Sequence, residues 1–284
     1  MGNILGRRAF LGRSLVLGAL WLAGLRPALA GIASLNEAIN KAGRMRMLSQ
    51  RMAKVYFQLG QGILPEASRR ILDLSMKLYQ EHLEDLKAYA PSADIRATYA
   101  ELEGIWKRYR QVLSGAPGLD GARLVAQINE EALRVAHLGT TQLELQSTSS
   151  VGRLVNISGR QRMLSQRLAK FYMMKRWGLG GPSLDSEAQL ARREFLSALE
   201  ALERAPENTA KIAGELELAR TQWVFFEQAL QQQSAGDRDA TYATNVATTS
   251  ERILEVMDRA TNLYAQLGAP AAVPAPAAPR AGGR

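Results

Sequence analysis

A segment of 17 residues occurs twice in this chain, and this repeat constrains the fold more than any other feature. Residues 40–56 read NKAGRMRMLSQRMAKVY and residues 156–172 read NISGRQRMLSQRLAKFY, with 12 identical positions at an offset of 116. Repetition of this kind indicates one structural unit that is built twice. The chain has 284 residues, which is enough for two ordinary domains.

Each unit is predicted to consist of four helices. Apolar residues recur at helical spacing between breaks rich in Gly and Pro, and the alternation typical of strands is absent. The expected helices span residues 33–60, 65–90, 93–114, 122–148, 150–177, 185–204, 207–232 and 237–266. The sequence therefore predicts an all-α fold of two tandem antiparallel four-helix-bundle units, residues 31–148 and 149–267. Since no Pro lies between Gly118 and Pro182, a long continuous helix could join the two units.

The two ends of the chain differ in composition from the repeats. Residues 6–12 read GRRAFLG, which is a twin-arginine pattern, and an apolar stretch and an A-x-A cleavage motif ending at Ala30 follow. We expect residues 1–30 to be a twin-arginine signal peptide cleaved after Ala30, which predicts a periplasmic protein; an uncleaved anchor is the alternative. Residues 268–284 are rich in Pro and Ala and are expected to form a disordered tail.

The composition argues against several classes of function. The chain has no Cys and two His, so disulfides and thiolate metal sites are excluded, and a His-rich metal centre is disfavoured. Outside the first 30 residues, 32 basic residues are mixed with 27 acidic ones, which is not the basic stripe of a nucleic-acid-binding protein. The sequence contains neither a nucleophile–base pair nor a cofactor loop, so we expect no enzyme activity and no cofactor.

An Arg lies at the centre of one face of the repeated helix. On a helical wheel this face consists mainly of small and uncharged residues, and it lacks Asp and Glu in both copies. If the two copies faced each other, the Arg pair would repel by roughly 2 kcal/mol, and a small anion between them would remove that repulsion. The predicted ligand-binding residues are Arg46, Arg162, Gly43, Gly159, Ser49, Ser165, Gln50 and Gln166.

The same pattern allows a purely structural interpretation. Arg46 and Arg162 could instead pair with acidic residues of another helix, such as Glu130, Glu131 or Glu251. The other arginines of the motif are expected to form salt bridges at the helix edges or to cap helices; these are Arg44, Arg51, Arg160 and Arg167. No ligand cluster surrounds His82 or His137 in the sequence.

The pattern Asn-x-x-Gly-Arg-x-Arg-Met-Leu-Ser-Gln-Arg, present in both copies, resembles the signature of the PilJ-type domain. This domain is the N-terminal sensor module of type IV pili methyl-accepting chemotaxis transducers, and it is related to the periplasmic sensor domain of nitrate/nitrite sensor histidine kinases. The resemblance implies a four-helix bundle whose first helix carries the signature. In the nitrate sensor kinases, an Arg of this helix from each subunit of a dimer binds one nitrate. Aligning the signature Gly with Gly43 and Gly159 places that Arg at Arg46 and Arg162.

Two hypotheses for the function follow. The first is an exported periplasmic sensory protein that binds a small oxyanion, nitrate or nitrite first, between the arginines of the two signature helices. The second is a ligand-free interaction module that docks on a membrane-bound sensor, a chemotaxis transducer or a pilus component. A homodimer is compatible with both, and nucleic acid is not an expected partner.

Overall fold

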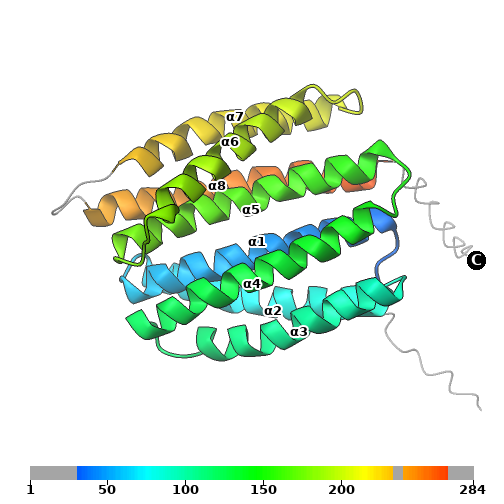
Figure 1. Ribbon diagram of the computed structural model, residues 1–284. Helices are drawn as coiled ribbons and strands as arrows, with labels where there is room; N and C mark the ends of the chain where they lie inside the picture. Colours follow the sequence, from blue (N-terminus) through cyan, green and yellow to red (C-terminus); the bar gives the residue numbers. More distant parts are fainter. Residues whose placement is uncertain (1–30, 233–238, 268–284) are drawn as a thin grey trace, which may run out of the picture. The chain divides into compact units, whose positions relative to one another are not determined.

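The computed structural model describes residues 31–232 and 239–267, and Figure 1 shows that the ordered elements in these ranges are helices. The helices are α1 (Leu35–Gly60), α2 (Pro65–Tyr89), α3 (Ala93–Leu113), α4 (Leu119–Glu144), α5 (Ser150–Arg176), α6 (Ser183–Glu203), α7 (Ala210–Gln231) and α8 (Asp239–Gln266). Their bounds agree with the predicted ones to within a few residues. Positions 237 and 238, where the last helix was expected to begin, lie outside the described residues.

Two helix starts show signals that are visible in the sequence. Ser34 precedes α1 in an extended conformation, and its hydroxyl accepts a hydrogen bond from the Glu37 N–H at 3.1 Å. The Glu37 carboxylate accepts in return from the Ala33 N–H at 2.9 Å, so the start of α1 is closed from both sides. Pro65 opens α2, where its missing N–H costs no helical hydrogen bond.

The helices form two groups of four, which share one continuous apolar core. Helices α1 to α4 make up the first bundle, and α5 to α8 make up the second. The two bundles meet along α1 and α5, which run parallel and side by side (Figure 1). The all-α prediction of tandem bundles is therefore confirmed, and the repeated segments lie against each other.

The suggested continuous helix between the units is wrong. Helix α4 ends at Glu144, and α5 begins at Ser150 and runs back antiparallel to α4 (Figure 1). The turn is closed by backbone hydrogen bonds from residues 146 and 147 to the last turn of α4. Beyond the helix end, the Ser149 N–H lies 3.4 Å from the Ser147 hydroxyl, so a short polar side chain meets a backbone group within the connection.

The repeat extends beyond the signature helix into the outer helices. In the first bundle, Tyr79 of α2 packs against Trp106 of α3 with ring centroids 4.5 Å apart. In the second bundle, Phe195 of α6 stacks on Trp223 of α7 at 4.2 Å. Each aromatic pair links the second and third helices of its bundle, so the same kind of aromatic contact stabilises both bundles.

The predicted signal peptide at residues 1–30 and the predicted tail at residues 268–284 lie outside the described residues. Within residues 31–232 and 239–267, none of the helices has both the length and the apolar composition that crossing a membrane requires.

Candidate functional site

Two glycines allow the signature helices to approach closely. A Cβ added at Gly43 of α1 would lie 3.9 Å from the Cα of Gly159 in α5, and the reciprocal distance is the same. The tighter contacts of an added Cβ would be with the arginines, at 3.3 Å from Nη2 of Arg46 for Gly43 and at 3.2 Å from Nη2 of Arg162 for Gly159. The two glycines therefore leave room for the guanidinium groups of Arg46 and Arg162, which lie beside each other.

Each Arg binds the first Asn of the opposite repeat. Arg46 donates from Nη2 to Oδ1 of Asn156 at 2.7 Å and to the Asn156 carbonyl at 3.3 Å. Arg162 donates from Nη2 to Oδ1 of Asn40 at 2.9 Å and to the Asn40 carbonyl at 3.3 Å. The contacts are reciprocal, as at a two-fold interface, although both helices belong to one chain.

The two guanidinium groups are buried close together. The Nη2 atoms of Arg46 and Arg162 lie 3.3 and 3.4 Å from the position that a Cβ of Gly43 would take, so they are no more than about 6.7 Å apart. At an effective dielectric of about 20, unit charges at this distance repel by at least about 2 kcal/mol. Both side chains are 0% exposed. The expected encounter of two like charges is thus present.

Desolvation affects the two arginines unequally. Burial, followed by the positive charges of Arg160 and Arg162, lowers the pKa of Arg46 to about 9. Burial also lowers the pKa of Arg162, to about 10, but the carboxylate of Asp258 opposes that shift. Both groups stay charged at neutral pH, and Arg46 is the less well compensated of the two.

The remaining predicted site residues make their hydrogen bonds elsewhere. The hydroxyls of Ser49 and Ser165 donate to the carbonyls of Arg46 and Arg162 within their own helices. Gln50 donates to Asn129 of α4 at 3.0 Å, and Gln166 donates to the Ser250 carbonyl of α8 at 2.9 Å. The two glutamines therefore hold the signature helices against α4 and α8, and the two serine hydroxyls bond within their own helices. The two glycines and two arginines come together.

The acidic partners suggested for the central arginines bind other basic groups. Glu130 pairs with Arg167 and Lys170, and Glu251 pairs with Arg51 and Lys54. Glu131 pairs with Arg108 at 2.7 Å. The carboxylate bound to Arg162 is that of Asp258, and Asp258 also binds Arg44. Among the described residues, no carboxylate pairs with Arg46, whose Nη1 lies 3.3 Å from Nδ1 of His137 instead.

The other arginines of the motif form ion pairs, as expected. Arg44 pairs with Asp258, Arg51 with Glu251, Arg160 with Glu194, and Arg167 with both Glu130 and Glu187.

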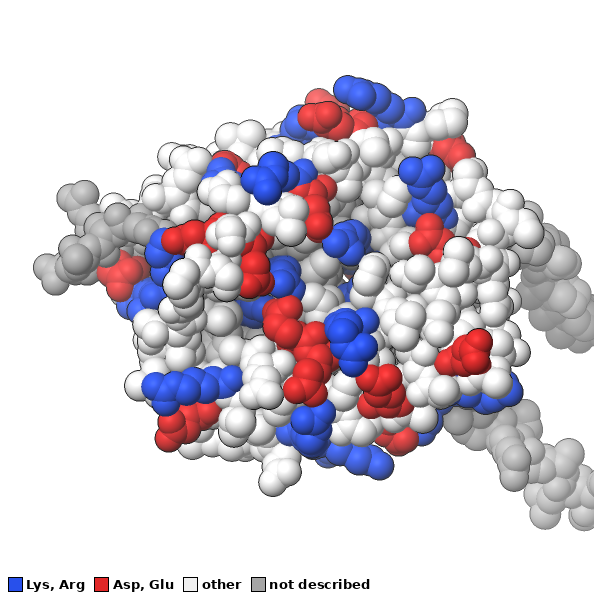
Figure 2. Space-filling view, viewed as in Figure 1, with Lys and Arg blue, Asp and Glu red and all other residues white. Residues whose placement is uncertain are grey.

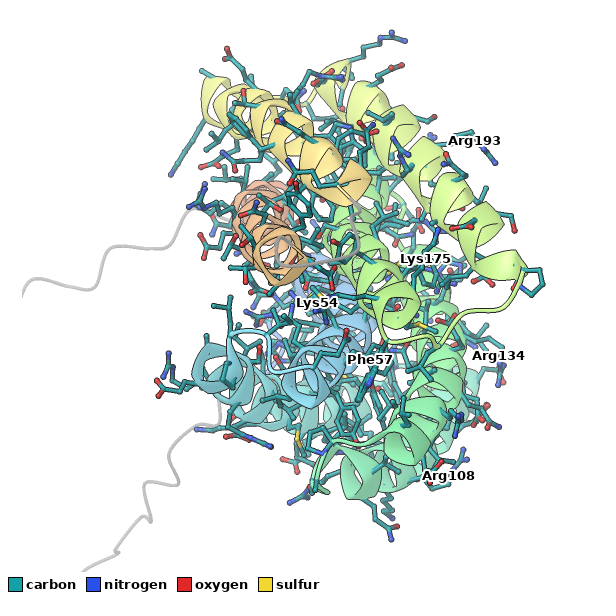
Figure 3. All side chains as sticks on the ribbon, turned by 90° about the vertical axis from the view of Figure 1, so that its left-hand side faces the viewer. Lys54, Phe57, Arg108, Arg134, Lys175 and Arg193 are labelled. Carbon is teal, nitrogen blue, oxygen red and sulfur yellow. The ribbon has the colours of Figure 1, made fainter. Side chains whose placement is uncertain are left out.

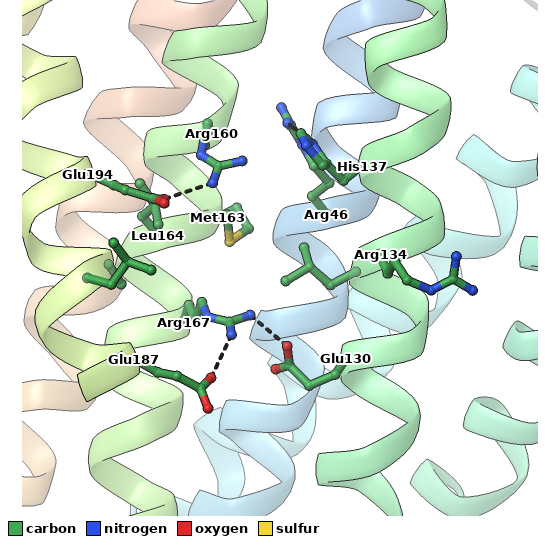
Figure 4. Close-up of a pocket in the computed structure, with 13 residues that line it drawn as sticks. Arg46, Glu130, Arg134, His137, Arg160, Met163, Leu164, Arg167, Glu187 and Glu194 are labelled. Carbon is green, nitrogen blue, oxygen red and sulfur yellow. Dashed lines mark hydrogen bonds and ion pairs between the residues drawn. The ribbon is translucent and has the colours of Figure 1, made fainter. Parts of the chain in front are cut away.

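A cavity of about 310 Å³ lies beside Arg46, between α4, α5 and α6. Figure 4 shows Arg46 and His137 at one side of it and Arg160 facing them from α5. Arg160 donates to Glu194 at 2.8 Å, and Arg167 lies farther along the wall, where it binds two carboxylates. Arg46 is thus the positive charge of this wall that lacks a carboxylate partner in the described part of the chain, and its Nε has no hydrogen-bond partner there.

His137 lies between Arg46 and solvent: its ring contacts the buried Arg46, and His137 itself is exposed. Desolvation by the surrounding side chains, followed by the positive charges of Arg46 and Arg160, lowers the pKa of His137 to about 4. The imidazole is therefore neutral at pH 7 and contributes no charge to the wall of the cavity. An anion placed beside it would favour its protonated form.

Two buried lysines were missed by the sequence analysis. Lys54 of α1 reaches Ser250 at 3.0 Å and Glu251 in α8, and Lys170 of α5 reaches Asn129 at 2.9 Å and Glu130 in α4. Each lysine therefore joins one bundle to the other. Figure 3 shows Lys54 and Phe57 between the bundles, whereas Arg108, Arg134 and Arg193 project outward. Both copies of the motif have a Lys at this position, and this identity could have indicated a shared structural role.

Basic and acidic side chains are mixed on the surface beside the cavity. Figure 2 shows Lys and Arg interspersed with Asp and Glu on the face that carries α4, α5 and α6. Within residues 31–232 and 239–267, no three His, Asp or Glu side chains are grouped in a way that could hold a metal ion.

Comparison with known proteins identifies the repeat. A family model described as the type IV pili methyl-accepting chemotaxis transducer N-terminal domain, PilJ, matches residues 28–130 and again residues 144–249. Searches of curated proteins and of solved structures find no match. The two matched ranges include both signature helices and together cover most of the chain. The chain therefore belongs to the PilJ family of signalling domains, of which it carries two tandem copies.

Proposed function

We propose that this chain is a sensory module that binds a small oxyanion, with nitrate or nitrite as the first candidates, against Arg46 at the junction of its two PilJ domains. The observation that carries the proposal is a fully buried guanidinium that faces a cavity and has no carboxylate partner among the described residues. A buried charge without a partner is costly, and a bound anion would offset that cost. The membership in a family of chemotaxis transducer domains supports a sensory role.

The proposed site uses the predicted residues in different ways. Arg46 offers its Nε and Nη1 to the anion, and Arg160 and His137 line the same cavity. Arg162 adds positive potential from within about 6.7 Å, and Gly43 and Gly159 make that distance possible. The space directly between the two arginines is occupied by their own Nη2 groups and the asparagines that bind them.

We also propose where the module works. The twin-arginine pattern of residues 7–11 would export the folded chain to the periplasm, with cleavage after Ala30. There, the ligand-bound form would act on a membrane-bound transducer. A binding site on the junction between two bundles suits this role, because an anion that reduces repulsion between α1 and α5 changes how the bundles pack.

A second candidate function rests on an exposed apolar face. On α7, the adjacent residues Val224 and Phe225 are 60% and 54% exposed, and adjacent exposed apolar side chains of this size can mark a protein-interaction site. This surface favours the alternative of an interaction module that docks on another protein without any ligand. In that case, the Phe225→Ser variant would lose the complex while anions had no effect on it.

Thermal unfolding in matched salts tests the first proposal. The chain is unfolded in nitrate, nitrite, sulfate and chloride at equal ionic strength, and a ligand at 100 times its dissociation constant adds about 2.7 kcal/mol of stability. We expect this gain with nitrate or nitrite and its loss in Arg46→Met. The control is Arg134→Ala, which removes an exposed Arg of the same cavity that pairs with Glu101. Equal unfolding curves in all four salts, or an undiminished shift in Arg46→Met, would refute the proposal.

A further inference from the structure

The two halves of the molecule differ at one position next to the central arginines. Glu130 of α4 binds the Lys and Arg of the second signature helix, and Glu251 of α8 binds the Lys and Arg of the first. These two glutamates are therefore equivalent. Seven residues farther along their helices lie His137 and Asp258, and each contacts Nη1 of a central arginine. His137 and Asp258 thus occupy the same place in the repeat.

Asp258 binds two arginines at once. Its carboxylate accepts from Nη1 of Arg162 and from Nε and Nη2 of Arg44, the latter at 3.2, 2.9 and 2.7 Å. Arg162 is the central Arg of the second copy of the signature. Arg44 lies two positions before the central Arg of the first copy. The contacts to Arg44 involve both oxygens, which is the forked geometry that matches a guanidinium to a planar anion.

The equivalent place in the first half has the same arginines, but the residue in the position of Asp258 is not acidic. Arg46 and Arg160 correspond to Arg162 and Arg44 through the 116-residue offset. His137 replaces the acidic side chain, and the cavity lies between the two arginines and the helices around them. Arg160 gives its Nη2 to Glu194, and no other hydrogen bond of its guanidinium is made among the described residues. Glu194 therefore takes Nη2 of Arg160, whereas Nε of Arg160 and Nη1 of Arg46 bind no carboxylate among the described residues. The counterparts of these two donors in the second half both bind Asp258.

We propose that Asp258 is a built-in substitute for the ligand, so that the chain has one open anion site, at Arg46, Arg160 and His137, and one site closed by its own carboxylate. The inference rests on the proposed function and makes it more specific. The substitute is planar, carries a single negative charge and offers two oxygens about 2.2 Å apart, as any carboxylate does. The ligand class is therefore a planar monoanion, such as nitrate, nitrite or formate, and a tetrahedral dianion such as sulfate is disfavoured.

Exchanging the two residues tests the proposal. Nitrate binding to the purified chain is measured by isothermal titration calorimetry, with formate and sulfate as comparison anions. We expect one site in the unmodified chain, two sites in Asp258→His, and at least a roughly 100-fold weaker affinity in His137→Asp, because the new carboxylate would take the place of the ligand. The control is Asp120→His, which removes an acidic side chain that is 96% exposed.

The outcomes separate this proposal from the proposed function. One site in both the unmodified chain and a folded Asp258→His variant would overturn the substitute role and leave the anion site intact. No site in the unmodified chain would refute the proposed function, and a nitrate site gained only by Asp258→His would still support the role of Asp258. If Asp258→His does not fold, His137→Asp decides alone, since unchanged nitrate affinity in that variant overturns the proposal. Circular dichroism establishes that each variant is folded.

Discussion

Replacing Glu251 by Gln should loosen the junction between the two bundles by about 3 kcal/mol. Glu251 of α8 accepts hydrogen bonds from Lys54 and Arg51 of α1, and Lys54 is 0% exposed while the Glu251 side chain is 19% exposed. Burial acts to raise the pKa of Glu251, but the positive charges of Lys54 and Arg51 outweigh it and lower the pKa from 4.5 to about 2. A shift of this size corresponds to about 3 kcal/mol, at about 1.36 kcal/mol per unit of pKa.

The variant also leaves a lysine buried without its counter-charge. Removal of one partner from a buried ion pair typically costs about 3–5 kcal/mol, which agrees with the value derived from the pKa. Because the folded-state pKa is depressed, the stabilisation is complete above about pH 4.5 and is lost as the pH falls through about 2. Urea unfolding of Glu251→Gln at pH 7, followed by tryptophan fluorescence, should therefore show the full loss.

The equivalent pair in the other half supplies the comparison. Glu130 binds Lys170 in the same way, but its side chain is 44% exposed, so Glu130→Gln should cost less than Glu251→Gln. Adding Lys54→Met to Glu251→Gln should recover part of the loss, because it removes the unpaired buried charge. A loss below about 1 kcal/mol in Glu251→Gln at pH 7 would refute the reasoning, since the buried lysine would then not depend on this carboxylate.

Three further predictions follow from buried or crowded positions. Burial, followed by nearby Arg and Lys side chains, lowers the pKa of His82 to about 4, and neither ring nitrogen has a hydrogen-bond partner among the described residues. The folded state therefore resists protonation of His82, stability should fall as the pH drops from 6.5 towards 4, and His82→Leu should flatten this part of a melting-temperature profile. A Cβ at Gly60 would lie 2.0 Å from the Trp177 ring, so Gly60→Ala should cost roughly 1–3 kcal/mol in urea unfolding, whereas Gly214→Ala, which meets nothing within 4 Å, should be neutral or stabilising. Nitrate affinity should rise as the pH falls from 7 towards 4, because an anion beside His137 raises the pKa of that ring from about 4 and couples binding to proton uptake. A constant affinity from pH 7 down to 4 in calorimetry would contradict the placement of the anion.

Most of the fold could be predicted from local features of the sequence. Prolines and glycines mark the helix ends, as at Pro65, and helical spacing of apolar residues marks the helices. The junction between α4 and α5 was ambiguous because it contains no Pro, and the helix ends there in a turn closed by backbone hydrogen bonds that lets the two helices pack antiparallel. Local propensity did not decide between a turn and a continuous helix at this point.

The candidate site was only partly predictable. The wheel placed Arg46 and Arg162 at the centre of a shared face, and the structure brings them together. It could not show that Asn40 and Asn156 bind these arginines, since those contacts cross from one repeat to the other. His137 and Asp258 were missed for another reason, because the offset between equivalent residues is 116 in the signature helices but 121 in α4 and α8.

The short connection between α4 and α5 affects how such a module would respond to dilution. Only residues 145–149 separate the helices of the two bundles, so the repeats meet within one molecule and not by collision of two. A tether this short keeps the local concentration of one repeat around the other very high at any protein level. In a receptor assembled from separate subunits, scarcity of the protein would deplete the paired state. In a single-chain module, the fraction of molecules that bind a ligand would depend on the ligand concentration and not on the number of protein molecules present.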